Sequence, residues 1–210
     1  MELKCGDCMD LIKELPANSV DILYSDAPYI PPEHKKTLTN YPRTLSEFAI
    51  LESFYKTFVK EIDRELKPSG RIYLYCNSDS YAMFYIHLFK YVKKLRCFVW
   101  DKIMCSLGYT FRHQHELILY GEREEAKPIK CGTGDIFKYR AVKANTKSHP
   151  AEKPIDLHKH ILQPYTNGEV VLDPFMGTGS IGVACKEMGL NYIGYEIEPC
   201  YYEVACERLK

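Results

Sequence analysis

A single glycine-rich turn near the carboxyl end constrains the fold of this chain more than any other feature. The segment VVLDPFMGTG at residues 170–179 has the pattern of a short apolar strand, a glycine loop and the start of a helix. The glycines let a ligand approach the backbone at the positive end of a helix. Gly177, Gly179 and Gly182 also match the spacing of a dinucleotide fingerprint, with Glu196 closing the next strand. Taken alone, the pattern fits a dinucleotide, an adenosyl-type cofactor or a tight turn that binds nothing.

The place of this unit in the chain decides how the sheet must be assembled. A dinucleotide-binding fold usually begins with such a unit and adds further strands after it. Here only 14 residues follow Glu196. The remaining strands must therefore come from the amino-terminal part of the chain, which predicts a circularly permuted sheet.

Apolar periodicity predicts that strands and helices alternate along the chain. The expected strands cover residues 19–25, 71–76, 95–102, 115–120, 169–173 and 192–196. The expected helices cover residues 44–66, 79–94, 154–163 and 180–188, with a last helix at the carboxyl end. Such alternation is typical of a mainly parallel sheet with helices on both faces. We therefore expect an α/β, Rossmann-like fold that forms a single domain over residues 1–210.

The composition is that of an ordinary globular protein and excludes several classes of protein. Apolar residues make up 46% of the 210 residues, and 28 basic residues balance 28 acidic ones. A uniformly basic DNA-coating protein is thereby excluded, whereas a protein with one local basic face is not. The longest uncharged run has 12 residues, too few for a membrane helix, so we expect no membrane partner. Nine cysteines without a secretory signal favour free thiols in a reducing cytoplasm, and the lone pair Cys5 and Cys8 predicts no metal site.

A second motif lies where the strand at residues 19–25 ends. Asp26, Ala27, Pro28 and Tyr29 place a carboxylate, a prolyl turn and an aromatic ring directly after that strand. In open α/β sheets, ligands bind at the carboxyl ends of the strands. The motif is therefore either part of a ligand site or a strand-ending turn with Tyr29 packed beneath it.

Together these motifs resemble the beta-class DNA amino-methyltransferases, permuted enzymes that use S-adenosylmethionine as cofactor. The resemblance covers nearly the whole chain, and the motifs follow the order that they have in that class. The motifs are GDC at residues 6–8, SVD at 19–21, DAPY at 26–29, LKPSGR at 66–71, WDK at 100–102, HELIL at 115–119, HPAEKP at 149–154, DPFMGTG at 173–179 and IGYE at 193–196. The fold implied is the circularly permuted methyltransferase fold.

The resemblance implies a role for each matched residue. Asp26, Ala27, Pro28 and Tyr29 would form the catalytic motif, and Asp26 would contact both the cofactor's amino group and the target amine. Lys153 lies in the motif that closes over the cofactor's carboxylate. The residues implied to bind the cofactor are Asp7 near the adenine, Glu196 at the ribose, Asp173, Phe175, Gly177 and Gly179 at the methionine end, and also Asp26, Lys153, Thr178 and Ser180.

The implied reaction transfers a methyl group to the exocyclic amine of a base flipped out of the duplex. That amine is a poor nucleophile because its lone pair is delocalised into the ring. Hydrogen bonds from its N–H groups to the Asp26 carboxylate and the Ala27 carbonyl would turn the lone pair toward the methyl group, so positioning would supply much of the rate. Tyr29 would stack on the base. Proline is usual in the class at the position of Ala27, but because the group required there is the carbonyl, we expect an active enzyme.

An acid at the first position of this motif favours adenine N6 over cytosine N4 within the class, so we predict an adenine-N6 DNA methyltransferase. Three other functions stay open: a cytosine-N4 DNA methyltransferase, an RNA methyltransferase, and a catalytically impaired homologue that only binds nucleic acid. A nicotinamide-dependent oxidoreductase has the glycine fingerprint and Glu196 as its only support.

Two basic segments are the expected DNA surface. One is the loop after Tyr29, and the other is the aperiodic segment 121–148, which we predict to be a short target-recognition insertion. Residues 126–147 contain six basic side chains against a single acid. The predicted DNA-binding residues are Lys35, Lys36, Arg43, Lys138, Arg140 and Lys143. Double-stranded DNA is the expected partner, and the resemblance adds a homodimer and a cognate restriction nuclease in a bacterial or archaeal cytoplasm.

Overall fold

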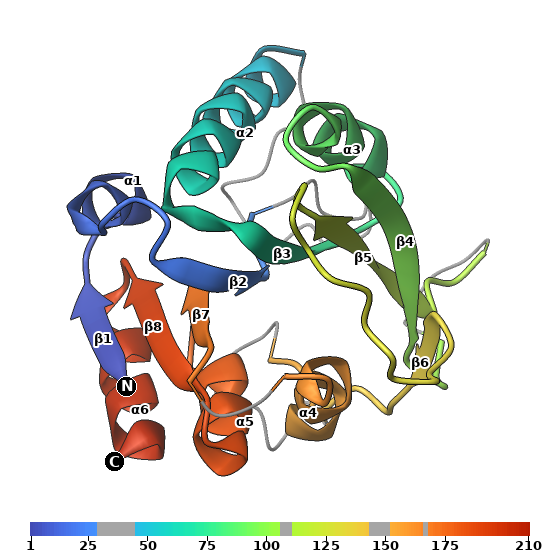
Figure 1. Ribbon diagram of the computed structural model, residues 1–210. Coiled ribbons are helices and arrows are strands. Elements are labelled where there is room, and N and C mark those ends of the chain that lie inside the picture. Colours follow the sequence, from blue (N-terminus) through green and yellow to red (C-terminus); the bar gives the residue numbers. More distant parts are fainter. Residues whose placement is uncertain (29–44, 106–110, 143–151, 166–167) are drawn as a thin grey trace.

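The computed structural model describes residues 1–28, 45–105, 111–142, 152–165 and 168–210, and for residues 45–47 only the backbone. A central sheet lies between helices on its two faces (Figure 1). In chain order the elements are β1 (Glu2–Cys5), α1 (Cys8–Leu11), η1 (Ile12–Glu14), β2 (Val20–Ser25), α2 (Leu45–Glu65), β3 (Leu66–Cys76), α3 (Tyr81–Phe89), β4 (Lys94–Asp101), β5 (His115–Glu122), β6 (Ile136–Lys138), α4 (Ile155–Leu162), β7 (Val170–Asp173), α5 (Ser180–Met188), β8 (Asn191–Glu196) and α6 (Pro199–Leu209).

The order of the strands confirms the permuted, mainly parallel sheet. Within the described residues the strands form one eight-stranded sheet in the order β1-β8-β7-β2-β3-β5-β4-β6. The neighbours from β1 to β3 are all parallel, and β5 is antiparallel to both β3 and β4. The last two strands of the chain therefore lie between β1 and β2, its first two strands, as Figure 1 shows.

Each face of the sheet buries its own hydrophobic cluster. On one face, α1, η1, α2 and α3 pack over alternate residues of the strands, such as Leu23 and Leu74. On the other face, α4, α5 and α6 cover the residues that point the opposite way, such as Tyr24 and Tyr75. The central strands β2 and β3 are thus apolar on both sides, which is why their sequences give continuous apolar runs rather than alternation.

Most predicted elements agree with the structure within a few residues, and the differences have local causes. The strand expected from Arg71 begins earlier, at Leu66, because β3 pairs with β2 through a shift in register that absorbs residues 67–70. The helix expected to reach Lys94 ends at Phe89, since Lys94 already begins β4. The elements that the sequence did not predict are β1, α1, η1 and β6, all of four residues or fewer and too short to show a period.

The structure also bears on the membrane and on the cysteines. Within the described residues, no helix combines the length and the apolar character that crossing a membrane requires. All nine cysteines are free thiols, including the exposed Cys5 and the buried Cys8. The same described residues contain no group of three or more His, Cys, Asp or Glu side chains that could hold a metal ion.

Candidate active site

Three carboxylates from distant parts of the chain meet at one edge of the sheet. Asp26 follows β2, Asp173 ends β7 and Glu196 ends β8. Because these strands are parallel neighbours, their carboxyl ends lie at the same edge. In open α/β sheets this edge, next to a change in strand order, is where ligands bind.

The glycine loop between β7 and α5 is held open toward this edge. Gly177 and Gly179 have φ of 53° and 79°, a left-handed conformation that favours glycine. A side chain added at Gly177 would meet no atom within 4 Å, whereas one at Gly179 would press on Ala205 at 3.2 Å. Gly179 is thus required by the packing of α6, and Gly177 leaves open space in front of the loop backbone.

Glu196 ties the loop to the neighbouring strand. Its Oε2 accepts a hydrogen bond of 2.8 Å from the Gly177 amide, and its Oε1 accepts one of 2.9 Å from the Glu198 amide. Asp7 lies beside it, since Gly6 N donates to the Glu196 carbonyl at 2.9 Å. The exposed Asp7 carboxylate caps α1 by accepting from the Met9 amide at 2.8 Å. The two acids predicted at opposite ends of the cofactor's adenosine are therefore close together, with Asp7 just after β1 and Glu196 at the end of the neighbouring β8.

Asp173 is buried within the loop and has a full set of hydrogen-bond donors. Its Oδ1 accepts from the Ser25 hydroxyl at 2.7 Å and from the Phe175 amide at 3.3 Å, and its Oδ2 accepts from the Tyr192 hydroxyl at 3.1 Å. Burial raises the pKa of the Asp173 carboxyl to about 7, against the opposing effect of these donors. Asp173 therefore supports the loop from inside.

The remaining loop residues divide between the core and the open edge. Phe175 is half-buried against α2, with its ring centroid 5.4 Å from that of Phe58. Thr178 is buried, and its carbonyl and hydroxyl oxygens accept from Arg208 at 3.0 and 3.1 Å. Ser180 begins α5 and is half-buried.

Asp26 has one oxygen engaged and one without a partner. Its Oδ2 accepts from the Lys153 ammonium, while Oδ1 is buried and has no hydrogen-bond partner among the described residues. Ala27 is completely buried, and the Pro28 carbonyl accepts from the Tyr55 hydroxyl on α2. Tyr29, the last residue of the predicted catalytic motif, lies outside the described residues.

Two residues that the sequence did not assign to the site extend the contact between Asp26 and Lys153. Glu116, on β5, has Oε2 at 3.5 Å from the Lys153 ammonium. Its Oε1 accepts from Lys102 at 2.6 Å. Lys153 is 4% exposed, and its ammonium lies 4.5 Å from the centre of the Tyr75 ring. The one sequence feature that could have indicated this cluster is Glu116 itself, an acid within the apolar strand segment HELIL.

Burial and opposite charges act against each other in this cluster. Burial raises the pKa of Asp26, and the Lys153 ammonium opposes that rise. For Lys153, burial acts to lower the pKa, but Asp26 and Glu116 outweigh it and raise the pKa. For Glu116, burial acts to raise the pKa, but Lys153 and Lys102 outweigh it and lower the pKa. These groups are therefore stabilised in their charged forms by one another.

A neutral hydrogen-bonded chain lies directly behind the charged cluster. The Tyr24 hydroxyl lies 3.1 Å from that of Tyr75 and 2.7 Å from Nδ1 of His158. Nε2 of His158 lies 3.2 Å from the Ser180 hydroxyl at the start of α5. Burial lowers the pKa of His158 to about 3, so the imidazole is neutral in the folded protein. This chain couples the core to the loop without adding charge.

The structure describes only part of the predicted DNA surface. Lys138 and Arg140 are exposed at the end of β6. Because β6 runs parallel to β4, with Lys138 opposite Asp101, its carboxyl end lies at the same edge of the sheet as Asp26. Lys35, Lys36, Arg43 and Lys143 lie outside the described residues.

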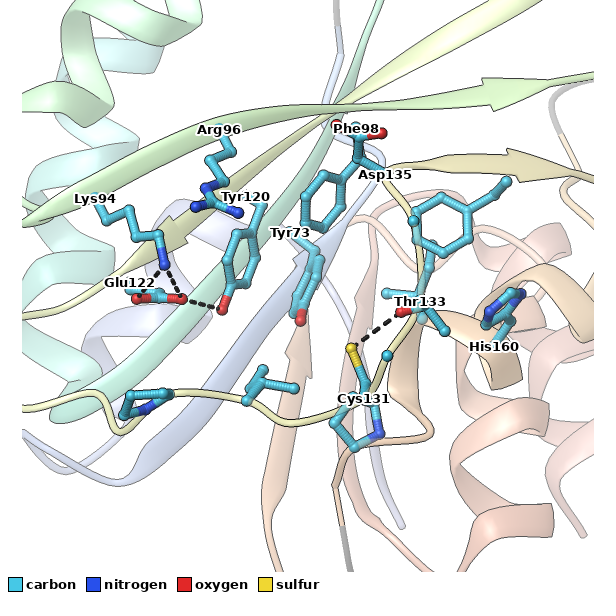
Figure 2. Close-up of a pocket in the computed structure, with 17 residues that line it drawn as sticks. Tyr73, Lys94, Arg96, Phe98, Tyr120, Glu122, Cys131, Thr133, Asp135 and His160 are labelled. Atoms are coloured by element: carbon cyan, nitrogen blue, oxygen red, sulfur yellow. Dashed lines mark hydrogen bonds and ion pairs between the residues drawn. The ribbon is translucent and has the colours of Figure 1, made fainter.

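A separate pocket of about 440 Å³ lies toward the opposite edge of the sheet, where β4 begins and β5 ends (Figure 2). The rings of Tyr73, Phe98 and Tyr120 form its floor, and Lys94 pairs with Glu122 at its rim, at 3.2 Å. The loop at residues 131–135 closes another side. None of the residues predicted for cofactor or catalysis lines it, so it is distinct from the edge that carries Asp26.

Comparison with known families gives a match over most of the chain. A family model described as DNA methylase matches residues 20–207. The Type II methyltransferase M.HinfI of Haemophilus influenzae is 29% identical over 247 aligned residues, which cover 98% of this chain and 67% of that protein. The Type II methyltransferase M.HpaI of Haemophilus parainfluenzae is 26% identical over 235 aligned residues, which cover 99% of this chain and 73% of that protein.

Solved structures match the fold over the whole chain. The M1.HpyAVI–SAM complex has a TM-score of 0.75 at 21% identity and covers 100% of this chain and 98% of that chain. The cytosine-N4-specific PvuII DNA methyltransferase has a TM-score of 0.80 at 16% identity and covers 99% of this chain and 86% of that chain. At these identities the likeness establishes the fold, and it confirms the methyltransferase fold expected from the motif order.

Proposed function

The chain belongs to the DNA methylase family, and on this premise we propose that it transfers a methyl group from S-adenosylmethionine to the N6 amine of an adenine in double-stranded DNA. The observation that carries the proposal is the Asp26 carboxylate at the end of β2, whose Oδ1 is buried without a partner in the described residues. A buried carboxylate oxygen without a donor is costly, and the N–H of a base entering the site would satisfy it.

The proposed reaction depends on positioning rather than on a strong base. One N–H of the exocyclic amine donates to Asp26 Oδ1 and the other to the Ala27 carbonyl, so the nitrogen lone pair leaves the plane of the ring and faces the methyl donor. The carboxylate also stabilises the positive charge that develops on nitrogen. The nitrogen would gain the methyl group as the sulfonium–methyl bond breaks, and it would then release one proton to solvent. Tyr29 would stack on the flipped base.

The carboxyl edge of β7 and β8 has the features that a nucleoside cofactor with a charged amino-acid end requires. The space in front of Gly177 leaves the loop backbone accessible, and Ser180 opens α5, whose positive end favours a carboxylate. We assign Gly177, Gly179 and Ser180 to the methionine end, Glu196 to the ribose and Asp7 to the adenine. Asp173, Phe175 and Thr178 act by holding the loop. When bound, the cofactor supplies an electrophilic methyl group.

The choice between adenine N6 and cytosine N4 rests on the acid at the first position of the motif. Both bases present an exocyclic amine next to a ring nitrogen, so either amine can be held by Asp26 and the Ala27 carbonyl. The similar PvuII enzyme is cytosine-N4-specific by its description, which keeps cytosine as the second candidate. Tritium transfer from labelled cofactor to duplex DNA, followed by mass spectrometry of the nucleosides, tests the proposal. We expect N6-methyladenine; N4-methylcytosine alone would refute the adenine assignment.

The same assay separates the other functions. RNA of the same sequence, incubated with the labelled cofactor, is the control for an RNA methyltransferase, and we expect no tritium transfer to it. Calorimetry with S-adenosylmethionine and with NAD distinguishes a methyltransferase from an oxidoreductase. Binding of DNA without any methyl transfer would identify a non-catalytic homologue.

We propose that the edge of the sheet formed by β4 and β6 faces DNA, with residues 121–148 contributing to target recognition. Contacts to phosphates release counterions, so affinity for duplex DNA should fall steeply with salt. Replacing Lys138 and Arg140 by alanine should lower the slope of log K against log salt by about one for each lost phosphate contact. Replacing the exposed Lys210 by alanine is the matched control. An unchanged slope of log K against log salt in the double variant would mean that the DNA surface lies elsewhere.

A homodimer and a partner nuclease are further proposals. Sedimentation would test the homodimer, and co-purification would test the nuclease.

A further inference from the structure

The charged cluster around Lys153 has a geometry that the proposed reaction does not by itself require. Four charged side chains from four separate segments form a chain of contacts: Asp26 after β2, Lys153 before α4, Glu116 on β5 and Lys102 after β4. They alternate in sign along the chain of contacts, with a carboxylate between the two ammonium groups and an ammonium between the two carboxylates. All four are mostly buried, at 20%, 4%, 16% and 22% exposure respectively.

Lys153 lies at the centre of this cluster and has three contacts among the described residues. Its ammonium contacts Asp26 Oδ2, lies 3.5 Å from Glu116 and faces the Tyr75 ring at 4.5 Å. Glu116 is in turn fixed from its other side by Lys102 at 2.6 Å. The orientation of Asp26 is thereby determined: Oδ2 is occupied by Lys153, and Oδ1 remains as the acceptor.

We propose that Lys153, backed by Glu116 and Lys102, is a positioning residue that keeps Asp26 ionised and turns its Oδ1 toward the target amine. This inference rests on the proposed methyl transfer to DNA. It also assigns Lys153 to the base side of the site, in place of the role on the cofactor's carboxylate that the family resemblance implied.

The charged groups around Asp26 determine the direction in which each substitution should move its pKa. Burial raises the pKa of Asp26, Lys153 and Lys102 lower it, and Glu116 raises it. Within the described part of the chain, Tyr75 and Cys76 on β3 and Asp173 on β7 also interact with Asp26. These three are neutral or acidic, and Lys153 and Lys102 are the described cations that oppose the effect of burial on the pKa of Asp26.

Two substitutions should therefore move the acid limb of the pH–rate profile in opposite directions. In Lys153→Met the pKa of Asp26 rises, so the acid limb of the rate constant for methyl transfer should move up by one pH unit or more. Below that limb the rate falls about tenfold per pH unit. In Glu116→Gln the acidic neighbour is lost while both lysines remain, so the limb should move to lower pH. A purely structural role would lower the rate by the same factor at every pH in both variants.

Three controls complete the experiment. Lys159→Met makes the same substitution at a lysine on α4 that forms an exposed ion pair with Glu187 on α5, and it should leave the profile unchanged. Lys153→Arg keeps a cation and should restore part of the wild-type profile. The dissociation constant of S-adenosylmethionine, measured by calorimetry, should change less than threefold in Lys153→Met. A tenfold weaker cofactor with an unmoved acid limb would overturn the proposal and return Lys153 to the cofactor.

A readout that does not need activity keeps the two proposals separate. Without Lys153, Asp26 and Glu116 become two buried carboxylates with raised pKa values, so the folded state retains protons that the unfolded state has lost. The melting temperature of Lys153→Met should therefore fall, relative to wild type, as the pH rises above about 5. If wild-type protein transfers no methyl group, the proposed function fails and this melting curve still tests the cluster. The cluster proposal fails alone if three results coincide: the wild type is active, the acid limb of Lys153→Met stays where it is in wild type, and the difference in melting temperature between the two proteins does not change with pH.

Discussion

Two aspartates end neighbouring strands of the sheet, and the structure gives them different surroundings. Asp26 follows β2 and has a cation on one oxygen and nothing on the other among the described residues. Asp173 ends β7 and receives three hydrogen bonds from neutral donors. Asp173 is buried and Asp26 is mostly buried, and burial raises the pKa of each. At the same edge of the sheet, Asp26 thus keeps one acceptor oxygen without a donor among the described residues, whereas both oxygens of Asp173 have donors.

The difference teaches how a site can hold a reactive carboxylate next to a structural one. A buried carboxylate with neutral donors can lower its cost by taking up a proton, and the pKa of Asp173 near 7 reflects this. A carboxylate that must accept from a substrate needs a counter-charge, which Lys153 provides for Asp26. We therefore expect substitutions at Asp26 to act on the rate and substitutions at Asp173 to act on stability.

Asp26→Asn should have the largest effect. The amide keeps the shape of the side chain but loses the charge that stabilises the developing cation, so methyl transfer to DNA should fall on the order of 10³-fold. Single-turnover kinetics with labelled cofactor measure this. Asp10→Asn, the same change at an exposed ion pair with Lys13, is the control. A loss below tenfold would remove Asp26 from the reaction.

Asp173→Asn should lower stability by roughly 1–3 kcal/mol at pH 5, because an amide cannot accept from all of the donors that surround this carboxyl. The loss should shrink as the pH rises. The pKa of Asp173 is raised in the folded state, so wild type loses stability between about pH 4 and pH 7, by up to about 1.4 kcal/mol per pH unit, and the variant does not. Urea titrations at pH 5 and pH 8 measure both values. Equal losses at the two pH values, or a rate loss as large as that of Asp26→Asn, would erase the distinction between the two aspartates.

Ala27→Pro should have the smallest effect. Ala27 is completely buried next to Asp26, and its contribution to the reaction is a carbonyl that proline also has. Proline would restrict the backbone by about 0.4–1 kcal/mol, so the rate of methyl transfer should stay within about tenfold of wild type. Rates of the two proteins under the same single-turnover conditions decide this. A gain above a thousandfold would mean that the alanine impairs the natural site.

Local sequence patterns were sufficient for most of the fold. The strand of β2 and the helix of α5 appear as apolar runs, and the loop between β7 and α5 is marked by its glycines. Short elements without a period were not predictable: β6 has three residues and is defined only by its pairing with β4. The early start of β3 likewise depends on a register shift against β2, a property of two strands rather than of one.

The site was predictable to the level of its motifs. Asp26, Lys153 and Glu196 were identified by their places in motifs, and the structure brings the first two into direct contact. Glu116 and Lys102 acquired no role from the sequence, because nothing local says that β5 and β4 lie close enough to reach Lys153. A charged residue within an apolar strand predicts a buried charge, but the sequence alone does not show which residue pairs with it.

The sequence by itself determined the class of fold, the permuted order of its strands and the edge at which the chemistry lies, because apolar periodicity and glycine geometry are local properties. Only the tertiary structure decided that Asp26 keeps one oxygen without a partner among the described residues, whereas both oxygens of Asp173 accept hydrogen bonds. That depends on side chains that are distant in the sequence. Lys153, before α4, reaches Asp26, and the hydroxyls of Ser25 and Tyr192 reach Asp173. In a poorly solvated interior such contacts are stronger than they would be in water. Asp26 and Asp173 are alike as letters in the sequence, and they differ through Lys153 on one side and Ser25 and Tyr192 on the other.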